Sequence, residues 1–171
     1  PVINKNHYIS FRGNLTPASF TGVGTFTISK SCNLTGNCNS LLFGNDAANN
    51  NNLSGKNYAF YKLFYNCTTI KNVSSNFLPA TTISDRCYSN MFSDCDLLTT
   101  APQLPATTIR GYCYESMFQN CSSLTTAPEL PATTLSKGCY NCIFLNCTSL
   151  KTAPELPATT ISSYCYSNMF N

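Results

Sequence analysis

Residues 104–129, LPATTIRGYCYESMFQNCSSLTTAPE, form one of several near copies that follow each other along the chain. The Leu-Pro-Ala-Thr-Thr that opens this stretch begins at Leu78, Leu104, Leu130 and Leu156, always 26 residues apart. A constant period of this size is typical of solenoids, in which each unit is one coil that buries its apolar face against its neighbours. The sequence therefore predicts a stack of coils, in which one position of the repeat is one physical environment.

Each copy divides into two halves with different patterns. In the first half, apolar residues recur at spacings that fit one stripe of a short helix (Cys113, Tyr114, Met117, Phe118 and Cys121). The second half, residues 124–128, contains β-branched threonines, ends in a proline and is long enough only for a short strand. We therefore expect a parallel sheet on one face of the stack and short helices on the other.

The repeated positions resemble a known family. Phe118-x-x-Cys121-x-x-Leu124-x-x-Ala127 and its copies are similar to the bacterial BspA-like subclass of leucine-rich repeats, and the resemblance covers roughly residues 58–171. It implies an α/β leucine-rich-repeat solenoid, with short parallel strands on the concave face and short helices on the convex face. Two features depart from that subclass: the unit is longer than usual, and alanine stands where a larger aliphatic residue is common.

Before Leu78 the repeat is weaker. We assign divergent coils to residues 38–77 and regular coils to residues 78–171, the last one incomplete. Two extra residues precede Leu78, which predicts a bulged loop at one rim, and the polar run 45–52 predicts a solvated loop. Residues 1–37 fall outside the repeat; residues 8–11 and 25–29 alternate apolar and polar, which predicts an antiparallel β element that caps the first coil.

The missing cover at the other end predicts that the natural protein continues beyond Asn171 and that this chain associates weakly with itself through its C-terminal coil.

Composition favours a secreted binding module. Charged residues make up 10% of the chain, and the net charge of +3 comes from scattered basic residues that form no stripe for a phosphate backbone. Nucleic acid is therefore not an expected partner, and the absence of a long apolar run argues against membrane insertion. The sequence holds no signal peptide, so an extracellular or cell-surface location is what the family resemblance implies.

The eleven cysteines mostly form two repeating columns, Cys87/Cys113/Cys139/Cys165 and Cys67/Cys95/Cys121/Cys147. Both columns lie on the apolar stripe, where cysteine serves as a small buried hydrophobic residue, so we expect most of the thiols to be free. Disulfides between column neighbours remain an alternative. Cys139-x-x-Cys142 stands alone with no histidine nearby, so neither a metal nor another cofactor is predicted.

Residues suited to catalysis are missing from the repeats. His7 is the single histidine and lies in the predicted cap, so no imidazole base stands beside a nucleophile. Glu129 and Glu155 occupy the same repeat position and therefore form a column, not a convergent acid and base pair. We expect no enzymatic activity and no catalytic residues.

Two functions from different classes are compatible with this pattern. The first is a non-catalytic extracellular module of a bacterial surface protein that binds a protein or a glycan, for example in adhesion to host matrix or other cells, as the resemblance implies. The alternative is a structural spacer that presents another domain, which the near identity of the copies favours. A ligand would contact the outward strand positions, namely Thr99, Thr100, Gln103, Thr125, Thr126, Glu129, Lys151, Thr152 and Glu155.

Overall fold

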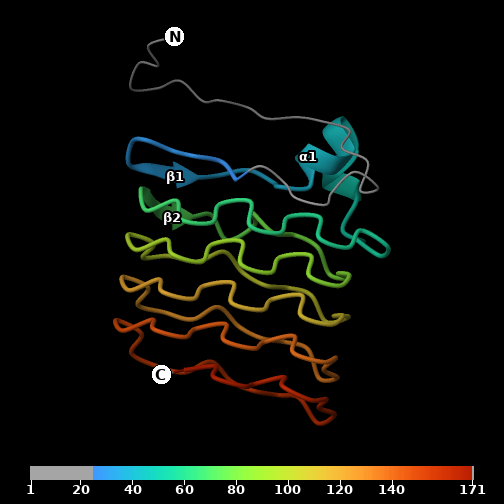
Figure 1. Ribbon diagram of the computed structural model, residues 1–171. Coiled ribbons are helices and arrows are strands. Elements are labelled where there is room, and N and C mark those ends of the chain that lie inside the picture. The colour runs from blue at the N-terminus through green and yellow to red at the C-terminus, as the bar shows by residue number, and fades with distance from the viewer. Residues whose placement is uncertain (1–24, 171) are drawn as a thin grey trace.

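The computed structural model describes residues 25–170, which wind into successive layers from β1 near one end to the C-terminal segment at the other (Figure 1). The regular elements all precede the regular repeats. They are β1 (Cys32–Leu34), the α-helix α1 (Ser40–Phe43), the 3-10 helix η2 (Gly44–Asn49) and β2 (Ile70–Val73). β1 pairs in parallel with β2, with Asn33 opposite Asn72 and an irregularity between Cys32 and Asn33.

The pairing that joins β1 to β2 continues through the repeats as isolated parallel bridges. Asn72 pairs with Thr100 and Thr100 pairs with Thr126, so successive coils meet at the same position of the repeat. A second column of bridges joins Thr82 to Thr108 and Thr134 to Thr160. We call the segments that carry these bridges, residues 98–109 and their copies, the extended wall.

The opposite side of each coil, residues 84–95, 110–121, 136–147 and 162–169, is a run of consecutive turns that we call the turn wall. Its backbone N–H groups donate alternately to a carbonyl of the next coil and to a carbonyl of the same turn. Tyr114 donates to the carbonyl of Cys139 in the next coil at 3.0 Å, whereas Glu115 donates to the carbonyl of Tyr112 in its own turn at 3.2 Å. This alternation satisfies the buried backbone within the coil and ties the coil to its neighbour at the same time.

The short helix predicted for residues 113–121 does not form, because the backbone has a positive φ at every fourth residue. Tyr112, Ser116 and Asn120 have φ values of 55°, 52° and 61°. In an α-helix every N–H donates to a carbonyl of the same helix, whereas here half of the N–H groups donate to carbonyls of the next coil. Left-handed residues other than glycine cost about 1–2 kcal/mol each, and the hydrogen bonds between coils offset this cost.

The interior is filled by columns of identical residues. Phe64, Phe92, Phe118 and Phe144 stack with ring centroids 5.5–5.9 Å apart, and a second ladder runs from Phe60 through Tyr88, Tyr114 and Tyr140. Stacked aromatic pairs of this spacing add about 0.5–1.5 kcal/mol beyond their area burial. Leu98 and Leu124 are fully buried, so the inward orientation predicted for this leucine position is confirmed.

Residues 25–34 belong to the stack. The strand predicted at residues 25–29 does not form, and no antiparallel pairing is seen there. Instead, Phe26 stacks on Phe64 at 5.7 Å and its N–H donates to the carbonyl of Leu63. The described part of the predicted cap is therefore continuous with the coils that follow it, and the strand predicted at residues 8–11 lies outside the described residues.

The two loops predicted for the divergent coils contain buried apolar residues that the sequence did not indicate. Before Leu78 the chain forms a turn in which Ser75 and Asn76 are exposed, while Phe77 is buried with its ring centroid 6.0 Å from that of Phe64. Within the polar run 45–52, residues up to Asn49 belong to η2 instead of an irregular loop, and Ala47 is buried. The buried Asn39 holds this segment by donating from Nδ2 to the carbonyl of Asn50 at 2.7 Å.

The burial predicted for both cysteine columns is confirmed. All eight column cysteines are buried, and the structure contains free thiols at these positions. The second column also has polar contacts that the sequence pattern did not indicate. The thiol of Cys121 donates to the carbonyl of Phe92 at 3.1 Å, and that of Cys147 donates to the carbonyl of Phe118 at 3.0 Å. Each thiol therefore links its coil to the preceding one.

Thiol titration is expected to give opposite results in the folded and denatured states. In the folded protein only the half-buried Cys32 and Cys142 should react rapidly, because the other thiols are buried. Denaturation without reductant should then expose most of the eleven thiols to the reagent. Finding two or fewer reactive thiols in the denatured chain would contradict this expectation and indicate a ladder of disulfides.

Candidate functional site

The nine residues proposed as a ligand-binding surface all lie exposed on the extended wall. Thr99, Thr100 and Gln103 come from one coil, Thr125, Thr126 and Glu129 from the next, and Lys151, Thr152 and Glu155 from the third. The wall brings them together because the bridge between Thr100 and Thr126 places equivalent residues of adjacent coils side by side. Neighbouring parallel strands are about 4.8 Å apart, so the exposed side chains form columns at that spacing.

Backbone hydrogen bonds hold this surface in place. The N–H of Thr99 donates to the carbonyl of Lys71 at 2.8 Å, and the N–H of Gln103 donates to that of Ser75 at 3.0 Å. The hydroxyl of Thr99 also lies 2.9 Å from Oδ1 of Asn72. The side chains of the wall are therefore presented from a backbone that is already ordered, which lowers the entropic cost of binding.

Chemically, the extended wall offers hydroxyls, one amide and a few charges. Glu129 and Glu155 stand at equivalent positions and Lys151 is exposed nearby in sequence, but no ion pair involves them among residues 25–170. Groups of three or more potential metal ligands are likewise not found in this part of the chain. The surface is suited to hydrogen bonding with an extended polar partner.

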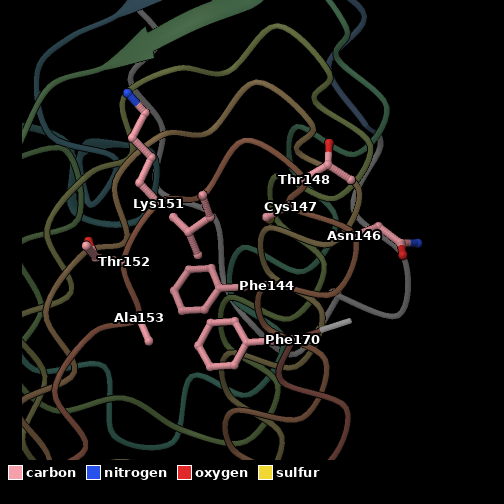
Figure 2. Close-up of a pocket in the computed structure, with 9 residues that line it drawn as sticks. Phe144, Asn146, Cys147, Thr148, Lys151, Thr152, Ala153 and Phe170 are labelled. Atoms are coloured by element: carbon pink, nitrogen blue, oxygen red, sulfur yellow. The ribbon is translucent and has the colours of Figure 1, made fainter.

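A hollow of about 260 Å³ lies at the C-terminal end of the stack, where Figure 2 shows the rings of Phe144 and Phe170 next to each other. Their centroids are 5.8 Å apart. Leu150, which also lines the hollow, is half-buried, whereas the equivalent Leu98 and Leu124 are fully buried beneath the next coil. The hollow is thus a side of this coil that no further coil of the structure covers. The residues that line it do not direct several polar groups at one point.

The two walls differ in how faithfully the copies repeat. On the extended wall, residues 98–109, 124–135 and 150–161 differ at three positions: Thr99 and Thr125 correspond to Lys151, Gln103 corresponds to Glu129 and Glu155, and Leu135 stands between two isoleucines. On the turn wall, the outward column Asp85, Gly111, Lys137 and Ser163 changes its chemistry at every coil. Variation from coil to coil is therefore concentrated on the turn wall, which sequence reasoning did not consider as a site.

Comparisons with family models, with characterised proteins and with solved structures gave no match to this chain. No helix among residues 25–170 is long and apolar enough to span a membrane. The assignment to a family and to a function therefore depends on the repeat pattern and on the surfaces described above.

Proposed function

We propose that the chain is a leucine-rich-repeat solenoid of the BspA-like type that acts as a non-catalytic interaction module of a bacterial surface protein. The observation that carries this proposal is the ordered array of exposed Thr, Gln and Glu side chains on the extended wall. Such an array offers repeated hydrogen-bond donors and acceptors to an extended partner, either a protein or a glycan. An extracellular or cell-surface location and a role in adhesion follow from the family resemblance.

The proposal is tested by measuring binding of the chain to immobilised matrix proteins and to a glycan array. A variant carrying Thr100→Lys, Thr126→Lys and Thr152→Lys should lose at least tenfold in affinity for a ligand of the extended wall, because three bulky cations interrupt the array. Ser122→Lys, at an exposed position beyond the extended columns, is the matched control and should retain binding. Equal binding by the triple variant would exclude the extended wall as the contact surface.

A structural spacer remains the second candidate, and the near identity of the copies on the extended wall supports it. Coils tied together along both walls form a stiff unit whatever they bind. If this chain is a spacer, neither the matrix proteins nor the glycans should bind above the level of an unrelated control protein, while the protein itself stays folded by circular dichroism.

We also expect the 171-residue chain to associate weakly with a second copy through its C-terminal coil. Ile161, Leu156 and Phe170 are 65%, 45% and 41% exposed there, and the extended segment of this coil presents an unpaired edge. Light scattering should therefore give an apparent mass that rises with protein concentration. Ile161→Lys should suppress the rise, whereas Leu97→Lys, at a similarly exposed leucine in the middle of the stack, should not.

A strictly monomeric chain at millimolar concentration, together with amide hydrogen exchange as slow in the last coil as in the middle ones, would contradict this expectation.

A further inference from the structure

An open hollow of about 460 Å³ lies on the turn wall, across four successive coils near the start of their turn segments. Its lining includes Tyr58, Asp85, Arg86, Gly111, Tyr112 and Lys137, and we call it the rim hollow. These residues come from the two outward columns in which the copies differ most, since Tyr58, Arg86 and Tyr112 share one repeat position and Asp85, Gly111 and Lys137 share the other. Among residues 25–170 this combination of side chains therefore occurs once, although the repeat itself occurs several times.

Two glycines shape the rim hollow. Gly138 occupies the position held by Tyr112 and Tyr164 in adjacent copies, and a Cβ atom there would lie 2.4 Å from Cε1 of Tyr112. The ring of Tyr112 can therefore lie against the backbone of the next coil only because residue 138 has no side chain. Gly111 lines the hollow itself, and a Cβ atom there would be in ordinary contact, 3.4 Å from Oδ1 of Asp85, which accepts the Gly111 N–H at 2.8 Å.

One of the two cationic side chains that line the rim hollow forms an ion pair, and the other forms none with the residues that the structure describes. The guanidinium of Arg86 lies 4.4 Å from the ring centroid of Tyr112 and forms an ion pair with Glu115. Lys137 has no carboxylate within ion-pair distance among residues 25–170, and its Nζ lies 6.0 Å from the ring centroids of both Tyr112 and Tyr164. An exposed ammonium between two aromatic rings thus stands two coils away from the hydrogen-bonded carboxylate of Asp85.

We propose that the rim hollow binds an acidic saccharide through a uronic acid unit. The sugar carboxylate pairs with Lys137, hydroxyls of an adjoining sugar unit two coils away donate to Asp85 and accept from Arg86, and the apolar face of a ring packs on the exposed ring of Tyr58 or Tyr164. An acidic peptide complements Lys137 equally well, but its ionised carboxylates only accept hydrogen bonds and cannot donate to Asp85, whereas each sugar unit carries free hydroxyls that both donate and accept. This inference deepens the interaction function proposed above and places its glycan contact on the other wall.

The test uses calorimetric titration of the full chain with an unsulfated oligosaccharide of alternating uronic acid and hexosamine units. We expect saturable binding that weakens at high salt, and at least tenfold weaker binding of the same oligosaccharide after its carboxyl groups are reduced to alcohols. Lys137→Gln should also lose at least tenfold. Lys151→Gln makes the identical change on the extended wall and should bind like the parent chain.

Several outcomes overturn the proposal: no binding of the oligosaccharide, equal binding of the reduced form or of Lys137→Gln, or tighter binding of an oligoglutamate peptide of matched charge. Gly138→Ala gives a second readout, because displacement of the Tyr112 ring should weaken binding while circular dichroism reports whether the coils remain folded. The triple variant Thr100→Lys, Thr126→Lys and Thr152→Lys separates the two proposals. It should leave saccharide binding intact even where it abolishes another interaction.

Discussion

Leu124→Arg is expected to prevent the chain from folding. Leu124 is fully buried, and its column places it between Leu98 and Leu150, so an arginine there has neither water nor a carboxylate within reach. An unpaired buried charge costs several kcal/mol, against a total stability of about 5–15 kcal/mol for a domain. Each coil is covered by its neighbours, so the damage extends to the coils on both sides.

Circular dichroism during thermal and urea unfolding measures this effect. Thr125→Arg provides the control, because it introduces the same side chain at the adjacent, exposed position and should melt close to the parent chain. A Leu124→Arg protein that melts within a few degrees of the parent would show that the stacked leucines do not form the core.

Alkaline pH is expected to unfold the protein cooperatively. Burial raises the pKa of Cys139 and Cys147 to about 12, from an ordinary value near 9. Burial likewise raises the pKa values of five further thiols well above that value, those of Cys38, Cys87, Cys95, Cys113 and Cys121. The thiols stay protonated in the folded state, so their contribution to stability is complete below pH 9 and is lost as the pH rises from 9 towards 12, where the unfolded chain alone releases protons.

The size of this effect follows from the number of thiols. One pH unit above the ordinary thiol pKa, each thiol that stays protonated in the folded state costs between about 1 and 2 kcal/mol of folding free energy. Seven such groups together remove about 10 kcal/mol at pH 10, which is comparable with the whole stability of a typical domain. Unfolding should therefore occur between about pH 9 and 10.5, with thiolate absorbance appearing at the same pH as the loss of circular dichroism.

Variants distinguish this mechanism from a general loss of charge balance. Cys113→Ala removes one buried thiol and should make the dependence of unfolding free energy on pH less steep by about one proton. Thr125→Ala, at an exposed position without a thiol, should leave the steepness unchanged. If the parent chain unfolds no more readily at pH 10.5 than at pH 7, the buried columns do not behave as protonated thiols.

The sequence pattern predicted many of the side chains that stack on each other in the core. Equal spacing of Phe92, Phe118 and Phe144 places the rings in equivalent environments, and the structure stacks them within 6 Å. The same reasoning predicted the buried cysteine columns, and the nine proposed contact residues are exposed. Whether these nine bind a ligand stays a prediction, because exposure alone does not select a partner.

The rim hollow could not be predicted in the same way. Arg86, Tyr112 and Lys137 are conspicuous in the sequence only as departures from the repeat. Their meeting requires a known register between three coils, and it also requires Gly138 to leave room for the ring of Tyr112. The signal in the sequence is that two outward columns differ from copy to copy. In each of these columns a glycine stands where the other copies have a larger residue.

By itself, the sequence determined the period and the inward columns, because a strict repeat gives equivalent residues equivalent surroundings. Only the tertiary structure decided the backbone of residues 113–121. Apolar residues at i, i+1, i+4, i+5 and i+8 fit a helix of 3.6 residues per turn and a chain of four-residue turns equally well over so short a stretch. The neighbouring coil resolves this ambiguity, because its carbonyls accept every second N–H, and a helix would keep those N–H groups for itself.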